Sequence, residues 1–185
     1  MNLPHQLRIQ ARANRLANHR LLGAMAALPP EDFHAPRTGF FPSLAETYNH
    51  ILLVDEYYVG ALYGDEGIAA RADAFKPSQT VADLAVRQQH SDERLIAFCD
   101  ALTQEGCDAE VAMQRRTHVQ RDLAAHVLAH LFMHQTHHRG QVHAMLSGTS
   151  VAPPQLDEFL MPSDANFRVA DMAALGWRED DIYGR

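Results

Sequence analysis

Four long segments of the chain carry apolar residues at the three- and four-residue spacing of an amphipathic helix. These segments span approximately residues 4–28, 43–62, 80–102 and 120–146. Between the last two segments, Val111 and Met113 fit a short extended segment. Connections of roughly 10–17 residues join the segments, which allows arrangements other than a simple up-and-down order. The pattern predicts an all-α fold, a four-helix bundle.

Typical helix-start and helix-stop residues mark the ends of these segments. Pro29 ends the first segment, and Gly148 follows the last. The second segment opens with Ser43-Leu-Ala-Glu46, a capping box in which a hydroxyl and a carboxylate three residues apart bind free backbone N–H groups. Thr80 begins the third segment in the same way. The helix boundaries are therefore specified locally.

The 185 residues fit a single domain. It consists of a bundle over residues 4–147 and a C-terminal extension over residues 148–185. The extension contains Phe159, Phe167 and Trp177, so we expect it to pack onto the bundle. Two short turns of helix are expected within it, at residues 155–161 and 169–175.

Composition excludes several classes of protein. The 16 Lys and Arg against 23 Asp and Glu give a formal charge of −7, which argues against binding to nucleic acid. The two cysteines, Cys99 and Cys107, form no C-x-x-C and are too few for a disulfide framework. There is no apolar run typical of a signal peptide or membrane span. We expect a soluble, cytoplasmic protein with no nucleic-acid or membrane partner.

Histidines are concentrated in the fourth segment. Seven of the 12 histidines lie between His118 and His143. At about 100° per residue, His134 and His138 fall within the apolar stripe that faces the core. Three others fall at its edge: His126, His130 and His137. Two buried imidazoles one helical turn apart fit a shared metal ion. The alternative is that both rings are hydrogen-bonded within the core, because a buried ring nitrogen without a partner costs about 1–3 kcal/mol.

The second segment supplies a third imidazole. His50 lies on the core-facing side with Val54, and bundle metal sites are built from inward side chains on facing helices. His50, His134 and His138 would form a three-histidine site with open coordination positions, which is typical of catalytic sites. The residues after His134 read Gln-Thr-His-His and lack the glutamate of H-E-x-x-H, which excludes a zinc protease of that type.

Five further residues are candidates to support a ligand or a substrate. They are His130, His137, Gln141, Asp55 and Tyr57. Gln141 could hydrogen-bond a ligand imidazole. Asp55 could orient a ligand, pair with Arg139 or form a surface salt bridge, and Tyr57 could supply a proton. No residue is identified as a catalytic nucleophile or base.

Three stretches resemble the DinB family of metal-dependent enzymes, also called YfiT-like and unrelated to the DNA polymerase of that name. They are HLFMHQTHHRGQVH at 130–143, NRLAN at 14–18 and YNHILLVD at 48–55. Together with their flanking residues they cover approximately residues 7–146. The THHRGQ core of the first stretch is the most specific of these matches.

The resemblance implies a four-helix bundle of up-down-down-up order and a homodimer. It also implies metal ligation by one histidine of the second helix and two of the fourth, which are His50, His134 and His138. This chain departs from the family pattern at Met133, where an asparagine often precedes the first of the two ligands on the fourth helix.

These observations support a metal-dependent enzyme acting on a small molecule. Relatives in the family use mycothiol or bacillithiol, so we expect thiol-dependent S-transfer or isomerisation ahead of hydrolysis. The alternatives are a non-catalytic metal-binding or stress-response protein and a purely structural bundle. Three imidazoles favour Zn or Ni, with Fe, Cu and Mn as further candidates. A low-molecular-weight thiol would be the second cofactor.

Overall fold

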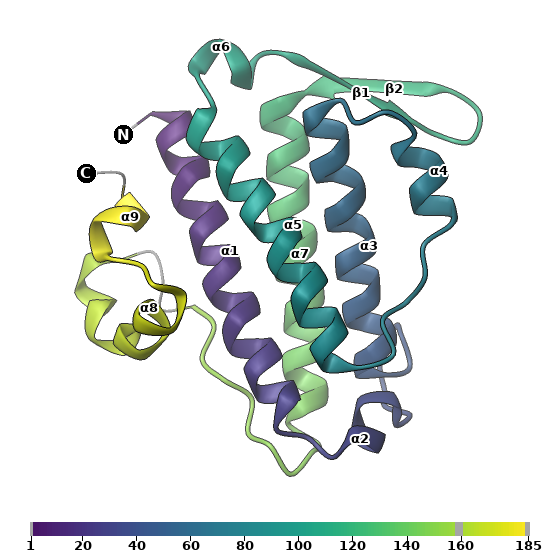
Figure 1. Cartoon of the computed structure of the whole chain (residues 1–185), viewed down its shortest axis with the longest axis vertical. Helices are drawn as coiled ribbons and strands as arrows, with labels where there is room; N and C mark the ends of the chain where they lie inside the picture. The colour runs from purple at the N-terminus through teal and green to yellow at the C-terminus, as the bar shows by residue number, and fades with distance from the viewer. Residues whose placement is uncertain (1, 158–160, 184–185) are drawn as a thin grey trace.

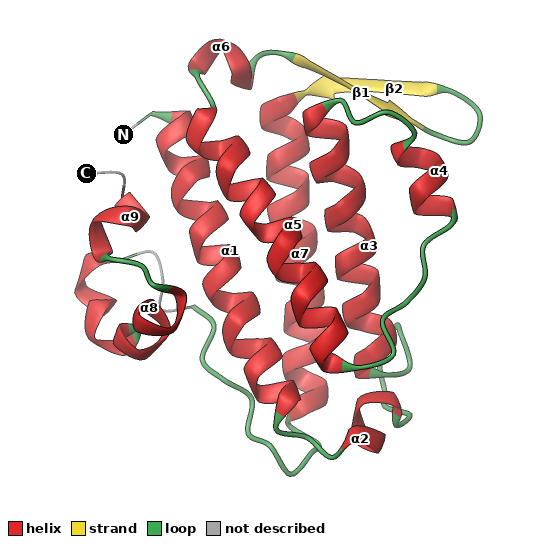
Figure 2. Ribbon diagram, viewed as in Figure 1, coloured by secondary structure: helices red, strands yellow, loops and turns green. Residues whose placement is uncertain are grey.

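Four long helices form the body of the fold (Figure 1), in a computed structural model that describes residues 2–157 and 161–183. They are α1 (Leu3–Ala26), α3 (Leu44–Tyr63), α5 (Val81–Ala101) and α7 (Ala124–Leu146). The shorter elements between them are α2 (Pro30–His34), α4 (Ile68–Asp73), α6 (Gln104–Cys107), β1 (Glu110–Gln114) and β2 (Val119–Leu123). Helices dominate the fold (Figure 2), and the predicted all-α bundle is confirmed.

The four long helices follow the expected up-down-down-up order. In Figure 1, α1 and α7 run downward, whereas α3 and α5 run upward. Each of α1 and α7 is antiparallel to both middle helices. α1 packs against α5 and α7, and α3 packs against the same two helices. Because α3 and α5 are parallel neighbours, residues 64–80 must return along the length of the bundle, which explains the long connection that contains α4.

Helix ends follow the local signals in the sequence. Ser43 Oγ accepts a hydrogen bond from Glu46 N at 3.1 Å, and Thr80 caps α5 in the same way. Gly64 ends α3 with a φ of 68°, a left-handed conformation that glycine adopts without steric penalty. The capping residues therefore set where α3 and α5 begin.

A two-stranded hairpin corrects the predicted start of the fourth helix. The helical spacing predicted a start near Gln120, but residues Val119–Leu123 form β2, which pairs antiparallel with β1, and α7 begins at Ala124. Val111 and Met113 alternate inward on β1 and cover the end of the core, as the expected extended segment suggested. Gln120 lies opposite Met113 in the hairpin. Its strand therefore satisfies its backbone N–H and C=O groups by pairing with β1 and not by helical hydrogen bonds.

The C-terminal extension packs against α1. It contains η1 (Pro162–Phe167), α8 (Val169–Leu175) and α9 (Glu179–Tyr183). Met172 and Ile182 bury their side chains against Ile9 and Leu16 of α1. The helical turn expected at 169–175 is confirmed. The one expected at 155–161 is wrong for residues 155–157, which are not helical, and residues 158–160 lie outside the described residues. Among the described helices, none is both long enough and apolar enough to cross a membrane.

The apolar core is divided into two clusters along the bundle. One cluster, near the hairpin, includes Leu95 and Leu128; the other, near α2, includes Leu21 and Val142. Polar side chains from all four long helices occupy the level between the two clusters. This division places charged groups at the centre of the bundle.

Candidate metal centre

Three imidazoles converge between α3 and α7. His50 lies in the second turn of α3, and His134 and His138 lie on successive turns of α7. The ring centroids are 4.9 Å apart for His50 and His134, 4.6 Å for His50 and His138, and 4.4 Å for His134 and His138. His50 Nε2 lies 3.0 Å from His134 Nε2. We call these three residues the histidine cluster.

The dimensions of the histidine cluster fit a metal ion. One nitrogen from each ring can be chosen so that all three lie within 4.8 Å of one another. Nitrogen ligands at about 2.1 Å from one ion are at most about 4.2 Å apart, so small side-chain rotations would complete the site. Imidazole donors suit Zn, Ni, Cu and Fe. The cluster therefore has the geometry and the chemistry of a metal-binding site.

Hydrogen bonds fix the orientation of His138. Its Nδ1 lies 2.8 Å from Gln141 Oε1, an acceptor, so Nδ1 carries the proton and donates it. This tautomer leaves Nε2 of His138 with a free lone pair, the form that binds metal. Gln141 Nε2 in turn donates to His137 Nε2 at 3.1 Å. Gln141 and His137 thus orient a ring of the cluster.

The surroundings keep the histidine cluster uncharged. Burial lowers the pKa of His50, and the neighbouring His138 lowers it further. Burial, followed by the other histidines, lowers the pKa of His134 to about 3. Burial also lowers the pKa of His138, although Gln141 acts in the opposite direction. Neutral imidazoles are the ligand form, so no proton has to be removed for metal to bind near pH 7.

An aromatic side chain from the α2–α3 connection covers the cluster. The Phe41 ring lies 4.6 Å from the ring of His50 and 5.8 Å from that of His138. Phe41 was not predicted as a site residue. The signal in the sequence was a Phe-Phe-Pro run directly before the Ser43 cap, because an apolar residue that precedes a cap often packs on the first turns of the helix.

His130 lies at the edge of the site, one turn before His134. Its ring centroid is 6.3 Å from that of His134 and 5.2 Å from that of Tyr58. Arg115, at the end of β1, donates to the Tyr58 hydroxyl at 3.1 Å. His130 therefore neighbours both the ring of His134 and the Tyr58 side chain that is bonded to Arg115.

The hydrogen bonds of Tyr57 and Asp55 join these two residues to the hairpin and to α5. The Tyr57 hydroxyl donates to the Gln114 carbonyl at 2.8 Å and holds the hairpin. Asp55 is 1% exposed, so a surface salt bridge is wrong. It accepts a hydrogen bond from Gln88 Nε2 at 2.7 Å. A helical wheel could place Asp55 at the edge of the apolar arc but could not show that α5 supplies a partner.

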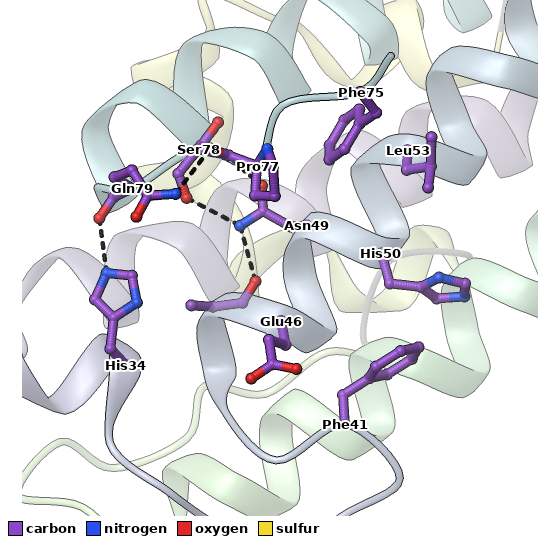
Figure 3. A pocket seen from close by; sticks show the side chains of 11 residues that line it. His34, Phe41, Glu46, Asn49, His50, Leu53, Phe75, Pro77, Ser78 and Gln79 are labelled. Carbon is purple, nitrogen blue, oxygen red and sulfur yellow. Dashed lines mark hydrogen bonds between the residues drawn. The ribbon is translucent and has the colours of Figure 1, made fainter. Parts of the chain in front are cut away.

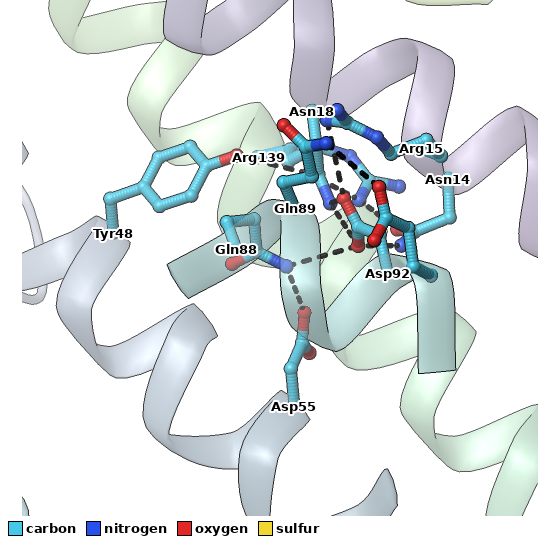
Figure 4. Close-up of polar contacts among 10 residues, drawn as sticks. Asn14, Arg15, Asn18, Tyr48, Asp55, Gln88, Gln89, Asp92 and Arg139 are labelled. Carbon is cyan, nitrogen blue, oxygen red and sulfur yellow. Dashed lines mark hydrogen bonds and ion pairs between the residues drawn. The ribbon is translucent and has the colours of Figure 1, made fainter. Parts of the chain in front are cut away.

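Asp55 belongs to a buried group that we call the polar layer (Figure 4). Its members come from all four long helices: Asn14, Arg15, Asn18, Tyr48, Asp55, Gln88, Asp92 and Arg139. Asp92 is the hub, because it accepts hydrogen bonds from Asn14, Asn18 and Gln88. It also pairs with Arg15 at 3.8 Å.

Arg139 enters the polar layer from α7, directly after the ligand candidate His138. Its guanidinium donates to the side-chain oxygens of Asn14 and Asn18. The residue is 8% exposed, and buried guanidinium groups require such partners. Asn18 is also bonded by the Tyr48 hydroxyl at 3.1 Å. The polar layer therefore connects the α7 turn that carries His138 to α1.

The polar layer predicts an unusual pH dependence of stability. Burial, and then the charge of Asp92, raises the pKa of Asp55 to about 7. Between about pH 4 and this value the folded chain keeps a proton that the unfolded chain releases, so stability falls as the pH rises through this window. The Asp55→Asn variant lacks this titratable group. Denaturation should be measured at about pH 5 and about pH 8 for the wild type and for Asp55→Asn. The free energy of unfolding of the wild type should fall between these two pH values by more than that of the variant. Equal changes in the two proteins would contradict the raised pKa of Asp55.

Comparison with known proteins finds a matching family, a related sequence and a similar fold. The sequence model of the DinB family matches residues 6–170. Protein DinB of Bacillus subtilis (strain 168) is 26% identical over 158 residues, which cover 80% of this chain and 89% of that protein. A crystal structure of a DinB-like protein, YjoA of Bacillus subtilis, superposes with a TM-score of 0.55 at 17% identity, covering 83% of this chain and 97% of that one. At that identity the structural match supports the fold alone.

Proposed function

The chain belongs to the DinB family, and on that premise we propose that it is a metal-dependent enzyme. The histidine cluster would bind one divalent ion, with zinc or nickel as the expected metal. The reaction would transfer the sulfur of a small thiol to a second small molecule. Family membership and a cluster of three histidines are compatible with metal binding; the reaction itself is the further step that we propose.

The observation that carries the proposal is a group of three imidazoles whose ligand atoms can reach one ion, which is one protein ligand fewer than a closed tetrahedral site has. Three protein ligands leave room in the coordination sphere for a substrate atom, as in catalytic rather than structural sites. The ring orientation of His138, set by Gln141, supports the same interpretation because metal-ligating histidines commonly donate their second N–H to a protein acceptor.

The residues of the chain would have distinct roles in this reaction. His50, His134 and His138 would hold the ion, and Gln141 would keep His138 in its ligand tautomer. When bound, the ion would supply Lewis-acid chemistry, lowering the pKa of a thiol so that it is held as the nucleophilic thiolate. The thiol proton would pass to solvent, sulfur would bond to an electrophilic carbon, and the leaving group would depart with the bonding electron pair. Phe41 would restrict access of water to this centre.

Cobalt-loaded protein offers a direct test. Titration with 2-mercaptoethanol should produce a near-ultraviolet sulfur-to-cobalt charge-transfer band, and zinc- or nickel-loaded protein should then show thiol-dependent consumption of an electrophile. The His138→Ala variant should lose both signals, whereas His90→Ala, an exposed residue on α5, should retain both.

Other outcomes of this test would support a different function or contradict the proposal. Thiol-independent turnover of esters or amides would indicate a metal-dependent hydrolase, in which the ion lowers the pKa of water. A charge-transfer band without turnover across a broad substrate panel would favour a non-catalytic metal-binding protein. Absence of the band in cobalt-loaded protein would contradict the proposal.

A further inference from the structure

A cavity of about 410 Å³ adjoins the histidine cluster (Figure 3). It lies between α3 and the chain segment that precedes α5. His50 and Phe41 line it on the side nearest the cluster, and Phe75 and Pro77 line it from the connecting segment. Its volume lies within the range of roughly 300–1,000 Å³ that is typical of small-molecule sites.

The polar groups along this cavity already have partners in the protein. The Asn49 side chain donates to the carbonyls of Ala45 and Ser78 and accepts from the Ser78 backbone N–H. His34 Nε2 is bonded to the carbonyl of Gln79 at 2.8 Å. Figure 3 shows these contacts along one side of the cavity. Apart from Glu46 and His50, the surface that remains available to a ligand is therefore formed by apolar side chains.

The charge at the cavity disfavours anions. Glu46 is a lining residue, and no lysine or arginine is among the described residues that line the cavity. A carboxylate or phosphate placed there would face a like charge, and the guanidinium of Arg87 behind Phe75 is already paired with Glu56.

The outer wall of the cavity is held in place by Arg87. Its guanidinium donates to the Lys76 carbonyl at 2.8 Å, lies 4.7 Å from the Phe75 ring centre and forms a two-pronged ion pair with Glu56. Together with the Asn49 contacts, these bonds fix the segment at both sides of Pro77. The cavity is thus preformed, so a ligand does not have to order its walls on binding.

We infer that this cavity binds an uncharged, apolar group of the substrate, with aromatic rings as the best fit. The assignment of that group to a substrate rests on the proposed function, but its binding does not require the metal. The reactive atom of the same molecule would then lie near His50, since this residue belongs to both the cavity wall and the histidine cluster. The substrate class is therefore a thiol or electrophile that carries an uncharged aromatic or alkyl group.

The inference is tested by titrating three thiols into cobalt-loaded protein and measuring the dissociation constant of each from its charge-transfer band. Benzyl mercaptan should bind about tenfold or more tightly than 2-mercaptoethanol, because its ring is removed from water. 4-(Mercaptomethyl)benzoate should bind more weakly than benzyl mercaptan, and Glu46→Gln should reduce this difference. Equal dissociation constants for the three thiols would overturn the inference.

Variants on opposite walls separate the cavity from the metal centre. Leu53→Trp, which adds volume, and Phe75→Ala, which removes the aromatic wall, should abolish the advantage of benzyl mercaptan and leave the dissociation constant of 2-mercaptoethanol unchanged. Val86→Trp, at a 71% exposed position on α5, should have no effect. If benzyl mercaptan still binds more tightly than 2-mercaptoethanol in both wall variants, the inference is overturned.

A metal-free experiment distinguishes failure of this inference from failure of the proposed function. Indole titrated into the metal-free chain should shift the NMR signals of the Leu53 methyl groups, and not those of the methyl groups of Leu175 in α8. If cobalt does not bind but these shifts occur, the proposed function fails and the cavity assignment stands. If cobalt and mercaptoethanol bind but indole causes no shift at Leu53, the cavity assignment fails.

Discussion

Purified protein should contain about one divalent ion per chain, and the three alanine variants of the histidine cluster should contain almost none. Each of His50→Ala, His134→Ala and His138→Ala removes one of the three imidazoles that can reach a shared ion. Two remaining ligands would not hold the metal through purification. Inductively coupled plasma mass spectrometry of untagged protein measures this result, and a chelator should lower the melting temperature of the wild type only.

Two further variants make this test specific. His143→Ala removes a histidine of α7 that lies outside the cluster, so metal content should remain at the wild-type level. Gln141→Leu leaves all three ligands but removes the acceptor for His138 Nδ1, and should weaken metal affinity by roughly 10–100-fold. A wild-type protein that stays metal-free after incubation with zinc or nickel at about pH 7.5 would refute the metal centre.

The largest effect on stability should come from Asp92. Its carboxylate is 1% exposed and faces the buried cations Arg15 and Arg139. Asp92→Ala would leave Arg15 without its ion-pair partner, remove one of the two buried carboxyl groups that act on Arg139, and leave the side-chain amides of Asn14 and Asn18 without an acceptor. Removal of one partner from a buried ion pair typically costs about 3–5 kcal/mol. Urea denaturation should show a loss of this size.

Asp100 provides a matched control on the same helix. It lies two turns beyond Asp92 and also pairs with two arginines of α1, Arg8 and Arg12, but its side chain is 39% exposed. Asp100→Ala should cost no more than about 1 kcal/mol, because solvent screens exposed pairs. Equal losses of stability in the two variants would show that burial does not determine how much the polar layer contributes to the free energy of unfolding.

The sequence predicted those features that depend on one helix at a time. Periodicity and caps were sufficient to place His50 on the inner side of α3 and His134 and His138 on the inner side of α7. Because α3 and α7 pack together, those inner sides meet. A bundle with the correct helix faces therefore brings the three rings to the same interface, and the axial register of the helices decides whether they meet.

Features that depend on two or more elements were not accessible in this way. Asp55 lies at the edge of an apolar arc on its own helix, and only the position of Gln88 on α5 shows that its carboxyl is buried and bonded. The strands of the hairpin have five residues each, too few for alternation to outweigh the helical spacing that continues into Gln120. Phe41 lies in an irregular connection, where periodicity carries no information.

The polar layer also determines the axial register of the four helices. A helix that slid along its neighbours by one turn, about 5.4 Å, would carry its polar groups into one of the two apolar clusters and leave charges without partners. Apolar side chains alone would tolerate such a shift more easily, because leucines at successive turns are interchangeable. Since Arg139 follows His138 directly, the same constraint fixes the height of His138 relative to His50. The bundle therefore aligns the histidine cluster from within, through residues that lie outside that cluster.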